Sequence, residues 1–155
     1  MIAPPKAFFR EDRPQDRPLD NPAAHYLLNA NSLMLRIRHG AVVFLLPGDI
    51  ELEDQRRHLL ASVPRERLAC DVLVAPAHGL DSAPELADAA RPRLTIASCH
   101  AQWAEACTAR QVFAAHGGQV YVTGLHGSVS VTSDGERWEV AMTGHVEQRE
   151  HGKEP

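Results

Sequence analysis

Residues 29–51 read NANSLMLRIRHGAVVFLLPGDIE and contain the most regular hydrophobic pattern of the chain. In its first half Leu33, Leu35 and Ile37 are separated by single residues, and this period of two is typical of a strand with one wetter face. After the His39-Gly40 pair the chain is apolar without interruption from 42 to 46, as expected for a strand covered on both faces. The pattern therefore predicts a β-hairpin over residues 32–46.

The chain beyond this hairpin alternates strands with helices. Further strands are predicted at 70–75, 94–97, 120–122, 127–132 and 138–142. A helix is predicted to begin at Asp49, and two more at the capping boxes that Ser82 and Thr108 open. Pro92 and the glycines after His116 are the stop signals of these last two helices. The order ββαβαβαβββ predicts an α/β fold.

Composition predicts one folded domain with two less structured ends. The chain has 155 residues, of which 44% are hydrophobic and 23% are charged, as in ordinary globular proteins. Prolines among charged residues predict an extended leader at 1–28, followed by the domain at 29–143 and a frayed polar tail at 144–155. The three cysteines include no CxxC pair and are predicted to be reduced packing residues; Trp103 and Trp138 are predicted to be packing anchors.

Charge and hydropathy exclude two classes of protein. The formal net charge of −4 argues against a general nucleic-acid-binding surface, so direct nucleic-acid binding is predicted to be weak or absent. No apolar run approaches the roughly 18 residues that cross a bilayer. The start of the chain also lacks the charged and apolar regions of a signal peptide. The isolated chain is therefore predicted to be soluble.

Two candidate site residues follow the strands that decide the fold. Asp49 comes after the apolar run at 42–46, and His78 comes after the run at 72–75. Side chains at the carboxyl ends of strands in α/β folds lie where ligands bind, and both residue types are metal ligands. Each has a second interpretation: Asp49 as a helix N-cap, and His78 as a polar turn residue before Gly79.

Three motifs resemble the C-terminal metallo-β-lactamase-like domain of ComEC-type competence proteins, which take up DNA. They are N-x-N-S-L-x-L-R, F-L-L-x-G-D-I-E and V-x-P-x-H-G. The resemblance runs from about Asn29 to about Gly135. It implies half of an αββα sandwich: a mixed sheet with helices on one face, corresponding to the second half of that fold. It also implies that Asp49 stands at the metal-bridging position and His78 at or beside the late histidine ligand.

The resemblance also implies a degenerate site. The family's first half supplies a His-x-His-x-Asp-His motif, which does not occur in this sequence. The family's P-H-H-G-S reads Pro-Ala-His-Gly-Leu at 76–80, and an N-x-Y-x-H-P stretch is replaced by residues 98–107, where His100 could substitute for the lost histidine. Two ligands do not complete a zinc site, so no cofactor is expected for the isolated chain. Zinc or manganese is expected if a partner half completes the site.

These implications leave two functions open. One is a catalytically inactive module linked to DNA uptake. The other is the second half of a split metal-dependent phosphodiesterase or nuclease completed by another chain. The implied partners are a complementary first-half chain or a membrane-channel chain of a DNA-uptake protein, with which the chain would associate at the membrane. Self-association is the alternative, because the 33–37 and 42–46 segments supply more apolar surface than helices on one side bury.

Overall fold

The structure, a computed structural model, describes residues 28–143. Apart from residue 28, the predicted leader lies outside the described residues, and so does the predicted tail. Within this range the chain forms a five-stranded sheet, a layer of helices and a separate two-stranded hairpin.

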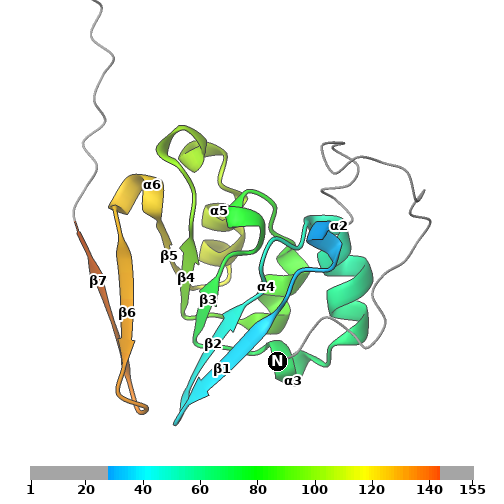
Figure 1. Cartoon of the computed structure of the whole chain (residues 1–155), viewed down its shortest axis with the longest axis horizontal. Coiled ribbons are helices and arrows are strands. Elements are labelled where there is room, and N and C mark those ends of the chain that lie inside the picture. Colours follow the sequence, from blue (N-terminus) through cyan, green and yellow to red (C-terminus); the bar gives the residue numbers. More distant parts are fainter. Residues whose placement is uncertain (1–27, 144–155) are drawn as a thin grey trace, which may run out of the picture.

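The five-stranded sheet confirms the predicted α/β class. Its spatial order β1-β2-β3-β4-β5 follows the order in the chain. The first two strands are antiparallel, with Leu35 opposite Leu46, and the remaining pairs are parallel. The strands are β1 (Leu35–His39), β2 (Val42–Leu46), β3 (Val72–Val74), β4 (Leu94–Ala97) and β5 (Gln119–Val122). Each parallel neighbour is reached by a crossover of the same hand, so the helices gather on one face (Figure 1).

The helical layer consists of short segments. The first crossover holds α2 (Leu52–Asp54), a π-helix (Gln55–Leu60) and α3 (Arg65–Leu68). The second holds a 3₁₀ turn (Pro76–Gly79) and α4 (Pro84–Ala90). The third holds a 3₁₀ helix (Ala101–Ala106) and α5 (Thr108–Ala115), and α6 (Thr123–His126) follows β5. As predicted, Pro92 and Gly117 lie directly after the ends of α4 and α5.

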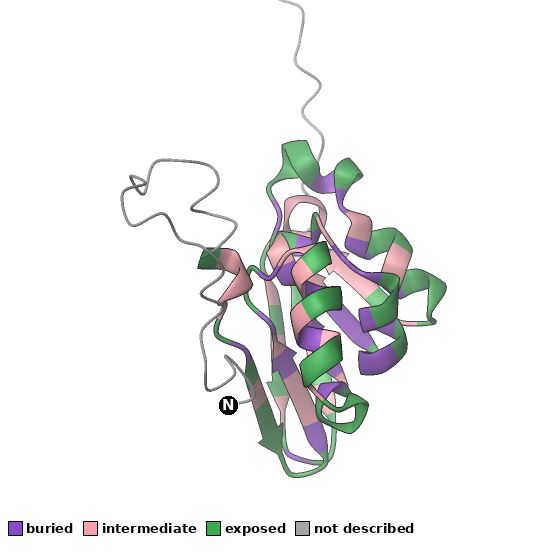
Figure 2. Cartoon of the chain, turned by 90° about the vertical axis from the view of Figure 1, so that its right-hand side faces the viewer, coloured by how far each residue is buried: buried purple, intermediate pink, exposed green. Residues whose placement is uncertain are grey.

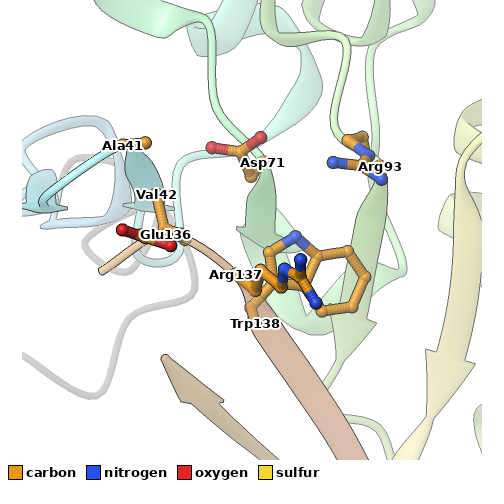
Figure 3. A pocket seen from close by; sticks show the side chains of 7 residues that line it. All are labelled: Ala41, Val42, Asp71, Arg93, Glu136, Arg137 and Trp138. Carbon is orange, nitrogen blue, oxygen red and sulfur yellow. The ribbon is translucent and has the colours of Figure 1, made fainter. Parts of the chain in front are cut away.

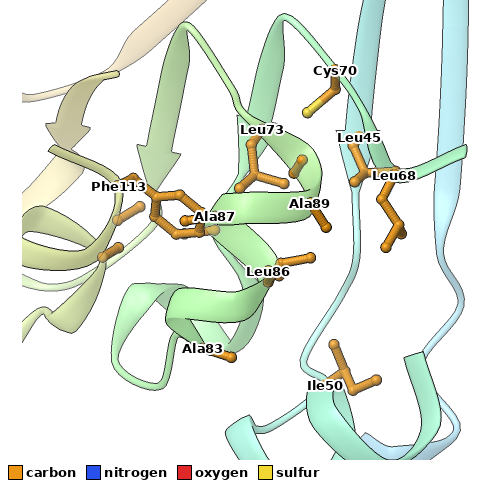
Figure 4. Close-up of a cluster of buried hydrophobic side chains, with 14 of the residues drawn as sticks. Leu45, Ile50, Leu68, Cys70, Leu73, Ala83, Leu86, Ala87, Ala89 and Phe113 are labelled. Atoms are coloured by element: carbon orange, nitrogen blue, oxygen red, sulfur yellow. The ribbon is translucent and has the colours of Figure 1, made fainter. Parts of the chain in front are cut away.

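The core lies between the helices and the sheet. Leu45 and Leu73 of neighbouring strands are fully buried, and Leu86 of α4 and Phe113 of α5 belong to the same cluster (Figure 4). The small residue Ala87 on α4 lets this helix approach the strands closely. All three cysteines are buried and free, which agrees with their predicted role in packing. Trp103 is 52% exposed, so its prediction as a packing anchor is wrong.

The other face of the sheet is partly covered by a hairpin. Strands β6 (Val129–Ser133) and β7 (Trp138–Met142) form this hairpin, on the side opposite to the helices (Figure 1). Its turn is joined to the β1–β2 turn, where the Ala41 N–H donates to the Gly135 carbonyl at 2.7 Å. A side chain at Gly40 would collide with that carbonyl, so the contact requires glycine.

The hairpin leaves the β1 side of this face open. Leu94 on β4 is fully buried, whereas Leu35 and Ile37, which share its face by register, are 36% and 49% exposed. Most of β1 is accordingly exposed (Figure 2). Register thus places Ile37 in one apolar row with Phe44, Val72 and Leu94, on the sheet face opposite to the helices.

Three predicted helix caps are wrong. The first helix begins at Leu52 with Glu51 at the N-cap position, so Asp49 does not cap it. Ala83 precedes α4 and Cys107 precedes α5, so neither Ser82 nor Thr108 is a cap. The backbone N–H of Ser82 donates instead to the Thr108 hydroxyl at 3.0 Å, and that hydroxyl donates to the Gly79 carbonyl. These contacts between distant segments are formed in place of the local helix caps that the residue spacing had predicted.

Candidate functional site

The structure brings Asp49 and His78 together at the carboxyl edge of the sheet. Asp49 lies three residues after β2 and His78 four residues after β3, and these strands are parallel neighbours. The Nε2 atom of His78 lies 3.4 Å from Oδ1 of Asp49. Their side chains are 60% and 53% exposed, so the pair lies at the surface and accessible to a ligand or a second protein.

Backbone contacts fix the two loops that carry this pair. The Ala77 N–H donates to the Gly48 carbonyl at 3.2 Å, which ties one loop to the other. The Asp49 N–H donates to the Ser32 hydroxyl at 3.0 Å. Gly79 lies against Ala97, where an added Cβ would be only 2.6 Å away. The positions of both side chains therefore follow from rigid loop contacts.

A hydrogen bond of the His78 imidazole determines which ring nitrogen carries the proton. Its Nδ1 lies 3.1 Å from the Ser98 carbonyl, which can only accept a hydrogen bond, so Nδ1 carries the proton. In the neutral ring Nε2 then presents a lone pair toward the Asp49 carboxylate. A contact of 3.4 Å between two acceptors, Nε2 of His78 and Oδ1 of Asp49, is favourable only with a proton or a cation between them. Ligands at about 2.1 Å from a tetrahedral zinc ion are about 3.4 Å apart, so the spacing suits either.

The loop around His78 has a strained backbone. Ala77 and His78 have φ values of 47° and 57°, and Gly79 continues the left-handed run with φ of 84°. For residues with a Cβ this region is unfavourable, and such outliers cluster at functional sites. Both the ligand and the turn interpretations of His78 are compatible with this conformation.

A buried glutamine that no sequence pattern indicated links the two loops. Gln55 is fully buried in the π-helix. Its amide nitrogen donates to the Ile50 carbonyl at 2.9 Å and the Asp81 carbonyl at 2.7 Å, and its amide oxygen accepts from the Ala83 N–H at 2.9 Å. A polar residue within an otherwise apolar helical stripe was the only signal, and it resembled a surface position.

His100 does not complete a ligand set. It caps the 3₁₀ helix Ala101–Ala106, where its Nδ1 accepts from the Gln102 N–H at 3.2 Å. Within residues 28–143, no three His, Cys, Asp or Glu side chains come together as a metal site. Asp49 and His78 therefore fit a metal as one edge of a coordination shell and leave its other positions to be supplied from elsewhere.

In the described part of the chain no helix has the length and apolar character required to span a membrane. No family model, curated protein or solved structure matches the chain.

Proposed function

We propose that this chain is a metallo-β-lactamase-like half domain that acts as an interaction module and is catalytically inactive alone. The observation that carries the proposal is the Asp49–His78 pair, with the nitrogen and oxygen 3.4 Å apart at the carboxyl edge of the sheet. The motif resemblance over residues 29–135 assigns the same two positions to metal ligands. The contact and the resemblance both concern only two of the ligands that a metal site requires.

Ligand count is the reason for inactivity. Catalytic zinc sites use three protein ligands and keep one position open for water or substrate. Asp49 and His78 provide two ligands, and His100 is engaged as a helix cap. A metal held by two exposed side chains would be mostly hydrated and would exchange readily.

The proposed partner is a protein that carries the complementary first half. The strip formed by Leu35 and Ile37 is apolar and exposed on the sheet face opposite to the helices, which is typical of an interface. In an αββα sandwich this sheet face packs on the other half, so docking there would also complete the metal site. By resemblance to ComEC-type proteins, we link this assembly to DNA uptake.

The orientation of His78 favours a second candidate, a split metal-dependent hydrolase. Its Nδ1 proton is directed to the Ser98 carbonyl at 3.1 Å, which leaves Nε2 available as a ligand. When bound, a metal ion would activate water and stabilise the charge that develops on a phosphodiester. Asp49 and His78 would hold it, and the hydrogen bond to Ser98 would orient the imidazole.

A hydrolysis assay tests whether the isolated chain is inactive. The purified chain is incubated with Zn²⁺ or Mn²⁺ and with bis(p-nitrophenyl) phosphate or single-stranded DNA. We expect no metal-dependent hydrolysis, because the coordination shell is incomplete. The same assay is repeated with His78→Ala and Asp49→Asn.

His116→Ala is the matched control, because His116 forms a similar surface pair with Asp88 at 3.1 Å. Metal-dependent hydrolysis that disappears in His78→Ala and Asp49→Asn but persists in His116→Ala would overturn the inactive module. It would establish the chain as a hydrolase without a partner.

A further inference from the structure

A recess lies at the amino edge of the sheet, opposite to the edge that carries the Asp49–His78 pair. It has a volume of about 450 Å³ and is lined by four separate segments: the start of β2, the residue directly before β3, the residue directly before β4, and the start of β7 (Figure 3). Val42, Asp71, Arg93, Glu136, Arg137 and Trp138 are among its lining residues. This volume is within the range of small-molecule sites.

The walls of this recess are held by backbone hydrogen bonds. Asp71 and Val43 bond reciprocally, because the Asp71 N–H donates to the Val43 carbonyl and the Val43 N–H donates to Oδ2 of Asp71, both at 2.9 Å. The Arg93 N–H donates to the Asp71 carbonyl at 2.9 Å. On the hairpin side, Asp134 accepts from the backbone N–H groups of Glu136 and Arg137, which lowers the pKa of its carboxyl. The recess is therefore preformed.

Positive charge in the recess is left without carboxylate partners. Among residues 28–143, neither the Arg93 nor the Arg137 guanidinium lies in an ion pair, although Asp71 and Glu136 line the same recess. Asp71 accepts from the Val43 N–H, and Glu136 forms no ion pair with either arginine. Two cations in one recess repel each other, and a bound anion would relieve that repulsion.

An aromatic surface adjoins these cations. The guanidinium carbon of Arg93 lies 5.8 Å from the centroid of the Trp138 indole, which is half-buried at the start of β7. The fully packed side chain of Val42 adds an apolar wall. A guanidinium fork binds two oxygens of a carboxylate or a phosphate, and an indole face binds a flat ring.

We propose that this recess binds a small oxyanion joined to a planar ring, with Arg93 and Arg137 holding the anion and Trp138 contacting the ring. A carboxylate and a phosphate share this chemistry. Glu136 and Asp71 keep the recess near neutral overall, so the ring contact, and not charge alone, is required for binding. This site is independent of the Asp49–His78 pair at the other edge.

The test uses the two indole N–H resonances of the full chain in NMR spectra. They are assigned with Trp103→Phe, since the chain has two tryptophans. Benzoate, adenosine monophosphate and inorganic phosphate are titrated separately. We expect benzoate or the nucleotide to shift Trp138 saturably and leave Trp103 unshifted, with inorganic phosphate binding about tenfold more weakly or worse. The tighter of the two ring-bearing probes identifies the carboxylate or the phosphate as the natural anion.

Arg93→Gln and Arg137→Gln should each weaken binding about tenfold or more, since charge-assisted hydrogen bonds are lost. Arg110→Gln, which removes an exposed arginine on α5, is the control and should leave binding unchanged. Arg137→Gln remains informative if loss of the Arg93–Trp138 contact disturbs the fold. Binding that neither lining variant weakens, an absence of saturation with both ring-bearing probes, or phosphate binding as tight as theirs would overturn the proposal.

Discussion

At the scale of single residues, the loop before Gly79 has two consecutive strained residues. Ala77 and His78 adopt left-handed backbone conformations, which cost roughly 1 kcal/mol or more for each residue with a Cβ. The surrounding contacts hold this conformation, and its result is the approach of His78 to Asp49. The strain at Ala77 can be tested by a substitution that relieves it.

Ala77→Gly should stabilise the chain by about 1 kcal/mol, because glycine adopts the φ of 47° without steric penalty. Urea unfolding measures the change. Ala114→Gly is the matched control on the exposed side of α5 and should destabilise by about 1 kcal/mol, since glycine weakens a regular helix. Equal losses of stability in the two variants would contradict the strained conformation.

The thiol of Cys70 should make stability fall in alkaline solution. Burial is the main cause that raises its pKa to about 12, and the charge of Asp71 adds to the effect. The fold thus favours the protonated thiol, so this contribution is complete below the unfolded pKa of about 9 and is lost as pH rises toward 12. The stability difference between the native chain and Cys70→Ala should shrink by about 1 kcal/mol from about pH 8 to about pH 10. Urea unfolding at both pH values measures it; a constant difference would be evidence against a desolvated thiol.

At the scale of elements, the π-helix is the support of the site loops. Replacing Gln55 with alanine leaves the Ile50 and Asp81 carbonyls and the Ala83 N–H without their buried partner. We expect a loss of about 2–4 kcal/mol in the free energy of unfolding. Gln102→Ala, at an exposed glutamine, should stay within about 0.5 kcal/mol. A small effect at Gln55 would show that the loops are held without it.

Strands were predictable where packing and periodicity agree. The segments 94–97 and 138–142 match β4 and β7, and β2 matches the uninterrupted apolar run. Helix starts were not predictable from spacing. The Ser82 backbone N–H donates to the Thr108 hydroxyl, and that hydroxyl donates to the Gly79 carbonyl, so neither side chain caps its own helix. Spacing in the sequence carries no information about such contacts.

The site was predictable only in part. Asp49 and His78 could be named because the ends of adjacent parallel strands meet at one edge of a sheet. The buried bonds of Gln55 and the recess around Arg93 and Trp138 join segments far apart in the chain, and no local pattern indicates them.

At the scale of the whole molecule, the open sheet face should mediate association of the isolated chain. Ile37 is 49% exposed on the sheet face opposite to the helices. We expect concentration-dependent self-association in sedimentation velocity experiments, and Ile37→Lys should reduce it by placing a charge on the strip. Thr132→Lys adds the same charge at an exposed position of β6 and should have no effect. A native chain that stays monomeric at high concentration and binds no hydrophobic dye would contradict the proposed interface.

The most direct test of the half site is the zinc affinity of the isolated chain, measured by competition with a chelating dye. Two exposed ligands predict binding at about 0.1 mM or weaker, reduced further in His78→Ala and unchanged in His116→Ala. One tightly bound, chelator-resistant zinc ion per chain that is lost in His78→Ala would contradict the account, because it would require a complete coordination shell within this chain.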